Sequence, residues 1–214
     1  MILVLDNEVD PELRYLGPEL VRLLPEAEYH VYPEEPVEPA VGDLDGVVLS
    51  GSTASVYDAD HADWIAAQAS LLDRCLTDSI PLLGICFGHQ LVNHALGGTV
   101  EADRFRGGFV RLRDVDERDP ILRGVGPVVP VVHGDVVVSP GEGMVRSAST
   151  DYSEYFCTRH ETAPVWTVQF HPELTREVGA KIDEFDPGSH SFADTTATRV
   201  LDNFAERCGL APPE

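Results

Sequence analysis

One of the four cysteines lies in a sequence context that suits a nucleophile. Residues 81–90 begin as an apolar run, and Gly84, Cys86 and Gly88 follow with the spacing Gly-x-Cys-x-Gly. With serine at the centre, this pattern is the nucleophile elbow, a sharp turn from a strand into a helix that exposes the nucleophile. Glycines are needed two positions to either side because larger side chains would collide in the turn. The N-terminal end of the following helix favours a thiolate. The alternative is a small core residue that ends a strand.

A thiolate nucleophile needs a base, and the position of His171 suits that role best. It follows the strand-like run 165–170, and active-site residues of parallel sheets collect at such strand ends. Glu173, two residues further on, can orient the imidazole ring. We interpret four other histidines as surface or structural residues, namely His30, His61, His160 and His190.

No metal site or disulfide framework is expected. His89 and His94 are five residues apart, a spacing that does not place both on one helix face. The remaining cysteines are far apart and form no Cys-x-x-Cys pair, so they are interpreted as core or surface thiols: Cys75, Cys157 and Cys208.

Together, these motifs resemble the class I glutamine amidotransferases. The segment 84–90, Gly-Ile-Cys-Phe-Gly-His-Gln, precedes Phe-His-Pro-Glu at 170–173, and the resemblance covers nearly the whole chain. It implies that Cys86 attacks the side-chain amide of glutamine, that His171 transfers protons and that Glu173 holds the imidazole. It implies no cofactor.

A third motif supports the resemblance. Residues 50–57, Ser-Gly-Ser-Thr-Ala-Ser-Val-Tyr, follow a predicted strand where the family has Ser-Gly-Gly-Pro-x-Ser-Val-Tyr. The family loop offers a backbone N–H to the oxyanion, which implies oxyanion donors at Ser52 and Phe87. Ser52 replaces glycine and Thr53 replaces proline, so the geometry of the loop is in question although the N–H of Ser52 remains. Without the other motifs, this stretch would be an ordinary turn.

The resemblance also implies residues that bind glutamine. Gln90 would help to hold the substrate, and Gly51 lies in the loop beside it. Residues 132–135, Val-His-Gly-Asp, are similar to the Ser-His-Gly-Asp stretch in the amidotransferase part of GMP synthase, which contacts glutamine mainly through its backbone. This similarity implies substrate contacts from Val132, Gly134 and Asp135. The alternative is a Gly-Asp turn that ends a strand.

Ammonia release implies an acceptor. The chain ends soon after its last predicted helix, so we expect a separate, ammonia-accepting synthetase partner, for example one that resembles the synthetase part of GMP synthase. Two alternatives remain open at this point. One is a free-standing hydrolase of γ-glutamyl compounds, and the other is a non-catalytic binding or regulatory module of the same fold.

The order of the secondary-structure elements predicts an α/β fold. Strands alternate with helices in the first half, which implies a mostly parallel central sheet in a three-layer αβα sandwich. The expected strands are 2–5, 29–32, 47–49 and 80–85, and the expected helices are 11–24, 62–76 and 88–96. Between 99 and 170 we expect further strands, some antiparallel, including 128–132 and 165–170. A loop at 177–194 and a helix at 196–207 complete a single domain, 1–214.

Composition excludes several classes of function. The chain has 37 acidic and 15 basic residues and a formal net charge of −22, which argues against nucleic-acid binding. No apolar run approaches the roughly 20 residues that span a bilayer, and the N-terminus resembles a first strand more than a signal peptide. We expect a cytoplasmic protein that binds no membrane. Dispersed acids with Lys181 as the only lysine resemble proteins of salt-accumulating organisms, the alternative being an ordinary acidic protein.

This charge distribution predicts that salt stabilises the fold. The Debye length is about 30 Å at 0.01 M ionic strength and about 3 Å at 1 M, so molar salt removes most of the repulsion between acids. We expect the melting temperature to rise steeply between low and molar potassium chloride. Thermal melts measure it, and a response that levels off by about 0.2 M would favour the ordinary acidic protein.

Overall fold

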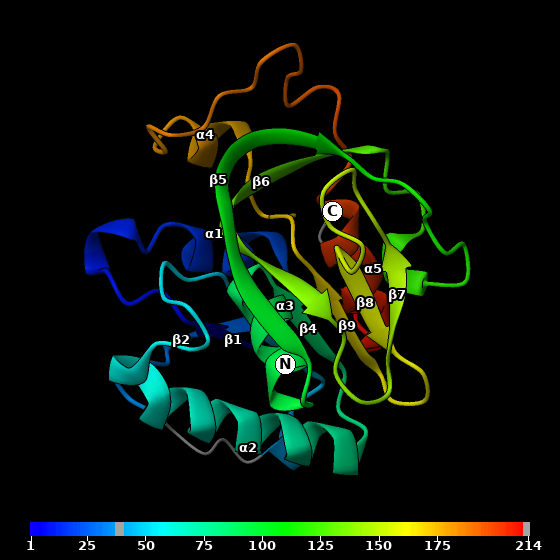
Figure 1. The fold of residues 1–214 in the computed structure, drawn as a ribbon. Helices are drawn as coiled ribbons and strands as arrows, with labels where there is room; N and C mark the ends of the chain where they lie inside the picture. The colour runs from blue at the N-terminus through cyan, green and yellow to red at the C-terminus, as the bar shows by residue number, and fades with distance from the viewer. Residues whose placement is uncertain (37–40, 212–214) are drawn as a thin grey trace.

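A seven-stranded sheet forms the middle layer of the molecule (Figure 1). The computed structural model describes residues 1–36 and 41–211, so positions 37–40 and 212–214 of the expected domain lie outside the described residues. The strand order is β2-β1-β3-β4-β9-β8-β7. In that order, the strands are Ala27–Val31, Ile2–Asp6, Gly46–Leu49, Leu82–Ile85, Val165–Val168, Cys157–His160 and Met144–Ala148.

The apolar runs in the sequence form the buried, parallel centre of the sheet. Strands β1, β3, β4 and β9 are buried along their whole length, as expected for parallel strands covered on both faces. Neighbouring strands from β2 to β9 are parallel, whereas β8 is antiparallel to both β9 and β7. The predicted parallel sheet with additional antiparallel strands is therefore confirmed.

Helices cover both faces of the sheet and complete the three layers. On one face, α1 (Leu16–Leu23) and α5 (Arg199–Arg207) pack against β1, β3 and β4 through residues such as Leu20 and Phe204. On the other face, α2 (Ala62–Asp78) and α3 (Phe87–Ala95) pack through residues such as Leu72 and Leu91. The predicted three-layer αβα sandwich is confirmed. Within the described ranges, no helix is long and apolar enough to cross a bilayer.

A long antiparallel ribbon was not foreseen in this form. Strands β5 (Thr99–Arg111) and β6 (Val128–Ser139) pair with each other, and β5 arches from the region of α3 past α4 to the top of the view (Figure 1). The sequence predicted shorter strands, of which 128–132 is the first part of β6. The pairing shifts register between Ala102 and Arg106, and such irregularities interrupt the alternation by which a long strand is recognised.

Two predicted boundaries were wrong. The expected helix 11–24 is a 3-10 turn, Pro11–Leu13, followed by α1, because Arg14 between them has a non-helical ψ of 60°. The expected loop 177–194 overlaps a short helix, α4 (Arg176–Gly179), whose first turn is capped by the hydroxyl of Thr175. The rest of this segment packs on β5 through a cluster of aromatic rings, namely Phe109, Phe185 and Phe192.

His89 is a fully buried residue that joins α3 to the central sheet. Its Nδ1 lies 2.7 Å from the hydroxyl oxygen of Thr167 on β9, and Asn93 donates to its carbonyl oxygen at 2.9 Å. Burial lowers the pKa of His89 to about 3, and the nearby His133 contributes to this lowering. The ring is therefore neutral in the folded protein at ordinary pH.

This burial predicts a loss of stability in mild acid. The unfolded state, where histidine has a pKa of about 6.5, binds more protons than the folded state, so stability falls as pH drops from about 6.5 toward 3. One such histidine contributes at most about 1.4 kcal/mol per pH unit. We expect His89→Gln to weaken this pH dependence and His94→Gln, at an exposed site on the same helix, to leave it unchanged. Denaturant unfolding at several pH values measures both slopes, and equal slopes for His89→Gln and the unmodified protein would contradict the assignment.

Candidate active site

Cys86 occupies a strained turn between β4 and α3. Its backbone has φ 51° and ψ −104°, a conformation that residues with a side chain rarely adopt. The flanking glycines explain how the turn fits. A Cβ on Gly84 would lie 2.6 Å from the carbonyl oxygen of Gly88, and a Cβ on Gly88 would lie 2.3 Å from the carbonyl oxygen of Leu49. The turn therefore has the geometry of the nucleophile elbow that its sequence indicates.

Backbone hydrogen bonds tie this turn to both neighbouring strands. The N–H of Cys86 donates to the carbonyl oxygen of Val168 at the end of β9, at 2.9 Å. The N–H of Gly88 donates to the carbonyl oxygen of Ser50, directly after β3, at 3.1 Å. The elbow thus lies where β3, β4 and β9 end side by side, the edge at which parallel sheets place their ligands.

His171 reaches the same edge from the end of β9. Its N–H donates to the carbonyl oxygen of Pro130 on β6 at 3.0 Å, and its Nδ1 lies 2.8 Å from Oε1 of Glu173. Both side chains are buried. The carbonyl oxygen of Val132 lies 3.7 Å from the sulfur of Cys86 and 3.4 Å from Nε2 of His171. The structure thus brings Cys86, His171 and Glu173 together.

The charges around His171 favour its protonated form. Burial alone would lower the pKa of this histidine, but the negative charges of Cys86 and Glu173, with hydrogen bonds to both, raise the pKa well above its usual range. An imidazolium at this position can give a proton to a leaving group.

A cavity of about 340 Å³ opens beside Cys86. Its lining includes six of the residues singled out from the sequence, namely Ser52, Cys86, Gln90, Val132, Gly134 and Asp135. This volume falls in the range of small-molecule sites. Gly51 does not line this cavity but lies against the catalytic pair, since a Cβ there would be 2.9 Å from Cε1 of His171 and 3.6 Å from Cβ of Cys86.

The side chain of Phe87 does not line the cavity. It is buried against Trp64, with ring centroids 5.4 Å apart, on the helix-covered side of the turn. The backbone N–H groups of Ser52 and Phe87 donate no loop, turn or cap hydrogen bond to any backbone carbonyl oxygen in residues 1–36 and 41–211. These are the two groups that the sequence indicated as oxyanion donors.

The polar lining of the cavity is already organised by hydrogen bonds. Nε2 of Gln90 donates to the carbonyl oxygen of Asp135 and to Oε1 of Gln169, both at 3.2 Å. The carboxylate of Asp135 accepts from the hydroxyls of Ser55 at 2.6 Å and Tyr57 at 3.0 Å. Both oxygens of the Asp135 carboxylate are therefore engaged by hydroxyl groups of the protein.

Three of these contributions were missed from the sequence. Ser55 and Tyr57 belong to the quoted 50–57 motif, but their partner is 80 and 78 residues away, so the motif alone does not show the contact. Phe105 lines the cavity from the irregular part of β5 and is 54% exposed, and no sequence pattern marks it.

His133 lines the cavity, and its ring is held by Tyr152. Its ring stacks on Tyr152 at 5.8 Å, and its Nε2 lies 2.9 Å from the hydroxyl oxygen of that residue. Burial lowers the pKa of His133 to about 4, so the ring is neutral near pH 7. Within the described part of the chain, no group of three or more histidine, cysteine or acidic residues is placed to hold a metal ion.

Comparison with known proteins identifies the family. The model of the family "Glutamine amidotransferase class-I" matches residues 19–182, a span that includes Cys86, His171 and Glu173. The chain belongs to the class I glutamine amidotransferases, as its motifs indicated.

Within this family, the chain is similar to one subunit of the glutamine-hydrolysing GMP synthases. It is 42% identical over 134 residues to this subunit from Methanosarcina acetivorans, a match that covers 61% of this chain and 65% of the relative. The chain thus spans somewhat less than two thirds of that relative. The subunit of the same name from Sulfurisphaera tokodaii is 32% identical over 166 residues, or 76% of this chain and 80% of the relative.

A solved structure has the same fold. The glutamine amidotransferase of Thermotoga maritima superimposes with a TM-score of 0.77 over 97% of each chain, at 20% sequence identity. At this identity, the likeness shows the fold alone.

Proposed function

We propose that this chain hydrolyses the side-chain amide of glutamine through a thioester on Cys86 and supplies the ammonia to a separate synthetase subunit. The observation that carries the proposal is the position of Cys86, which lies in a strained turn at a cavity and shares the carbonyl oxygen of Val132 with His171. We also propose that residues 1–214 act as one amidotransferase domain, which the continuous seven-stranded sheet supports.

In the first step, the thiolate of Cys86 attacks the amide carbon of glutamine, and the carbonyl oxygen gains negative charge. The free N–H groups of Ser52 and Phe87 are the donors for this oxyanion. The tetrahedral intermediate then breaks its C–N bond while the imidazolium of His171 protonates the leaving nitrogen. Ammonia and a γ-glutamyl thioester on Cys86 are the products of this step.

In the second step, the thioester is hydrolysed. His171, now neutral, takes a proton from water as the water oxygen attacks the thioester carbon. The C–S bond breaks, glutamate leaves and the thiolate re-forms beside the imidazolium. Throughout both steps, Glu173 holds Nδ1 of the ring at 2.8 Å, so that Nε2 faces the reacting groups.

The similarity to a GMP synthase subunit supports the identity of the partner. Each of these relatives is named as one subunit of an enzyme, which favours a second, ammonia-using subunit. We therefore propose that the synthetase subunit of a GMP synthase receives the ammonia.

The role of Cys86 is tested by ammonia release from glutamine, with and without the synthetase subunit of a GMP synthase supplied with its substrates. We expect Cys86→Ala to abolish release, because no nucleophile remains. We expect His171→Gln to lower kcat by about 10² to 10⁴-fold, the usual contribution of acid–base catalysis. Cys208→Ala, distant from the cavity, is the control and should keep full activity.

Retained activity in Cys86→Ala would contradict the mechanism. Glutamine hydrolysis that no synthetase subunit can use would instead favour a free-standing hydrolase of γ-glutamyl compounds.

A further inference from the structure

The loop that carries Ser52 is held at its beginning by the end of β1. The hydroxyl of Ser50 donates to Oδ1 of Asp6 at 3.0 Å and accepts from the N–H of Asn7 at 2.9 Å. The side-chain amide of Asn7 also donates to the carbonyl oxygen of Ser50 at 3.3 Å. These contacts fix the loop before Ser52, but they leave its far side to other residues.

The far side of the loop is held by Glu8. The carboxylate of Glu8 accepts from the backbone N–H of Thr53 at 2.9 Å and from its hydroxyl at 2.6 Å. A third donor, the N–H of Asp10, lies 2.9 Å from the same carboxylate. Glu8 is only 8% exposed, so water competes little for these bonds. Burial raises the pKa of Glu8, and the hydrogen bonds from Asp10 and Thr53 counteract this by stabilising the ionised form. Hydrogen bonds to the ionised carboxylate are about twice as strong as neutral ones.

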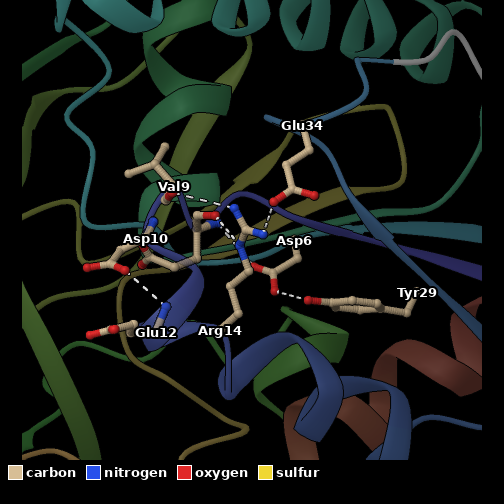
Figure 2. Close-up of polar contacts among 8 residues, drawn as sticks. Asp6, Val9, Asp10, Glu12, Arg14, Tyr29 and Glu34 are labelled. Atoms are coloured by element: carbon tan, nitrogen blue, oxygen red, sulfur yellow. Dashed lines mark hydrogen bonds and ion pairs between the residues drawn. The ribbon is translucent and has the colours of Figure 1, made fainter.

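The backbone of Glu8 is itself held by hydrogen bonds from its neighbours. The guanidinium of Arg14 donates to the carbonyl oxygen of Glu8 at 2.9 Å. It also donates to the carbonyl oxygen of Val9 at 3.4 Å and forms an ion pair with Glu34 (Figure 2). The N–H of Glu8 donates to Oδ1 of Asp6 at 3.1 Å. Because the backbone of Glu8 is held on both sides, the carboxylate has a fixed position from which to bind Thr53.

We propose that Glu8 is a positioning residue that holds the Ser52 N–H where the oxyanion forms, through its two hydrogen bonds to Thr53. This inference rests on the proposed function. It also explains how the loop can keep its geometry although Thr53 replaces the family's proline. A proline at position 53 would have no N–H to donate to Glu8. In this chain, hydrogen bonds from Thr53 to a buried carboxylate fix the loop.

The small cavity beside the loop connects Glu8 to the reacting groups. It has a volume of about 70 Å³, and its lining includes Glu8, Thr53, Ser52, Cys86 and His171. Thr53 also lines the larger cavity at Cys86. A change in the Glu8 contact therefore acts directly on the wall of the active site.

An amide cannot replace this carboxylate fully. Three donors converge on the two oxygens of Glu8, whereas glutamine offers one acceptor oxygen and an NH₂ group that would face a donor. We expect Glu8→Gln to lower kcat for glutamine hydrolysis about 10 to 100-fold, toward the loss seen when an oxyanion donor is removed. We expect KM to change less than about threefold, because the Ser52 N–H stabilises the transition state more than the substrate.

Three further variants make the test specific. Thr53→Val removes only the hydroxyl donor, so it should cause a smaller fall in kcat, and it serves if Glu8→Gln does not fold. The double variant Glu8→Gln with Thr53→Val should have the same kcat as Glu8→Gln, because both substitutions disrupt the same contact between Glu8 and Thr53. Glu12→Gln removes the same charge from an exposed residue nearby and should have full activity.

Hydrogen exchange at Ser52 to Ala54, read by mass spectrometry on the same samples, is independent of catalysis. We expect faster exchange in Glu8→Gln and Thr53→Val than in the unmodified protein and Glu12→Gln. If the unmodified protein is active and Glu8→Gln has the same kcat, the role of Glu8 is overturned. The role is also overturned if Glu8→Gln loses kcat while hydrogen exchange at Ser52 to Ala54 stays the same. An unmodified protein that releases no ammonia with its synthetase partner would overturn the proposed function instead.

Discussion

The backbone conformation of Cys86 is the constraint on which the rest of the site depends. A non-glycine residue at φ 51° costs of the order of 1 to 3 kcal/mol, so the surrounding structure has to hold it in place. Two hydrogen bonds to neighbouring strand ends supply part of this support, and the close approach of Gly88 to Leu49 leaves no room to relax. The result is a sulfur that points to the cavity from the end of β4, with the helix α3 starting at the next residue.

Sheet order then decides which residues meet the sulfur. Strand β4 lies between β3 and β9, so the Ser52 loop and His171 approach Cys86 from opposite sides although they are more than 100 residues apart in sequence. The ribbon of β5 and β6 closes the site, since Val132 on β6 supplies the carbonyl oxygen near both the sulfur and the imidazole. Each of these strands therefore supplies groups that surround the thiol of Cys86.

The sequence was informative where a function needs local geometry. The two glycines around Cys86 and the apolar strands predicted the elbow and the α/β sandwich, because the steric limits of a turn and of a buried strand act over a few residues. The sequence could not show that Asp135 binds Ser55 or that Glu8 binds Thr53, since each contact joins segments at least 45 residues apart. The length of β5 was missed because a register shift at 102–106 breaks its alternation.

The most direct test of the proposed chemistry is a crystal structure of the protein after reaction with a glutamine analogue that carries a chloroketone in place of the amide. The account predicts one covalent bond, from the sulfur of Cys86 to the analogue. It also predicts that the analogue's carbonyl oxygen lies within about 2.7 to 3.1 Å of the backbone nitrogens of Ser52 and Phe87. An adduct on Cys75, Cys157 or Cys208, or a carbonyl oxygen turned away from both nitrogens, would contradict it.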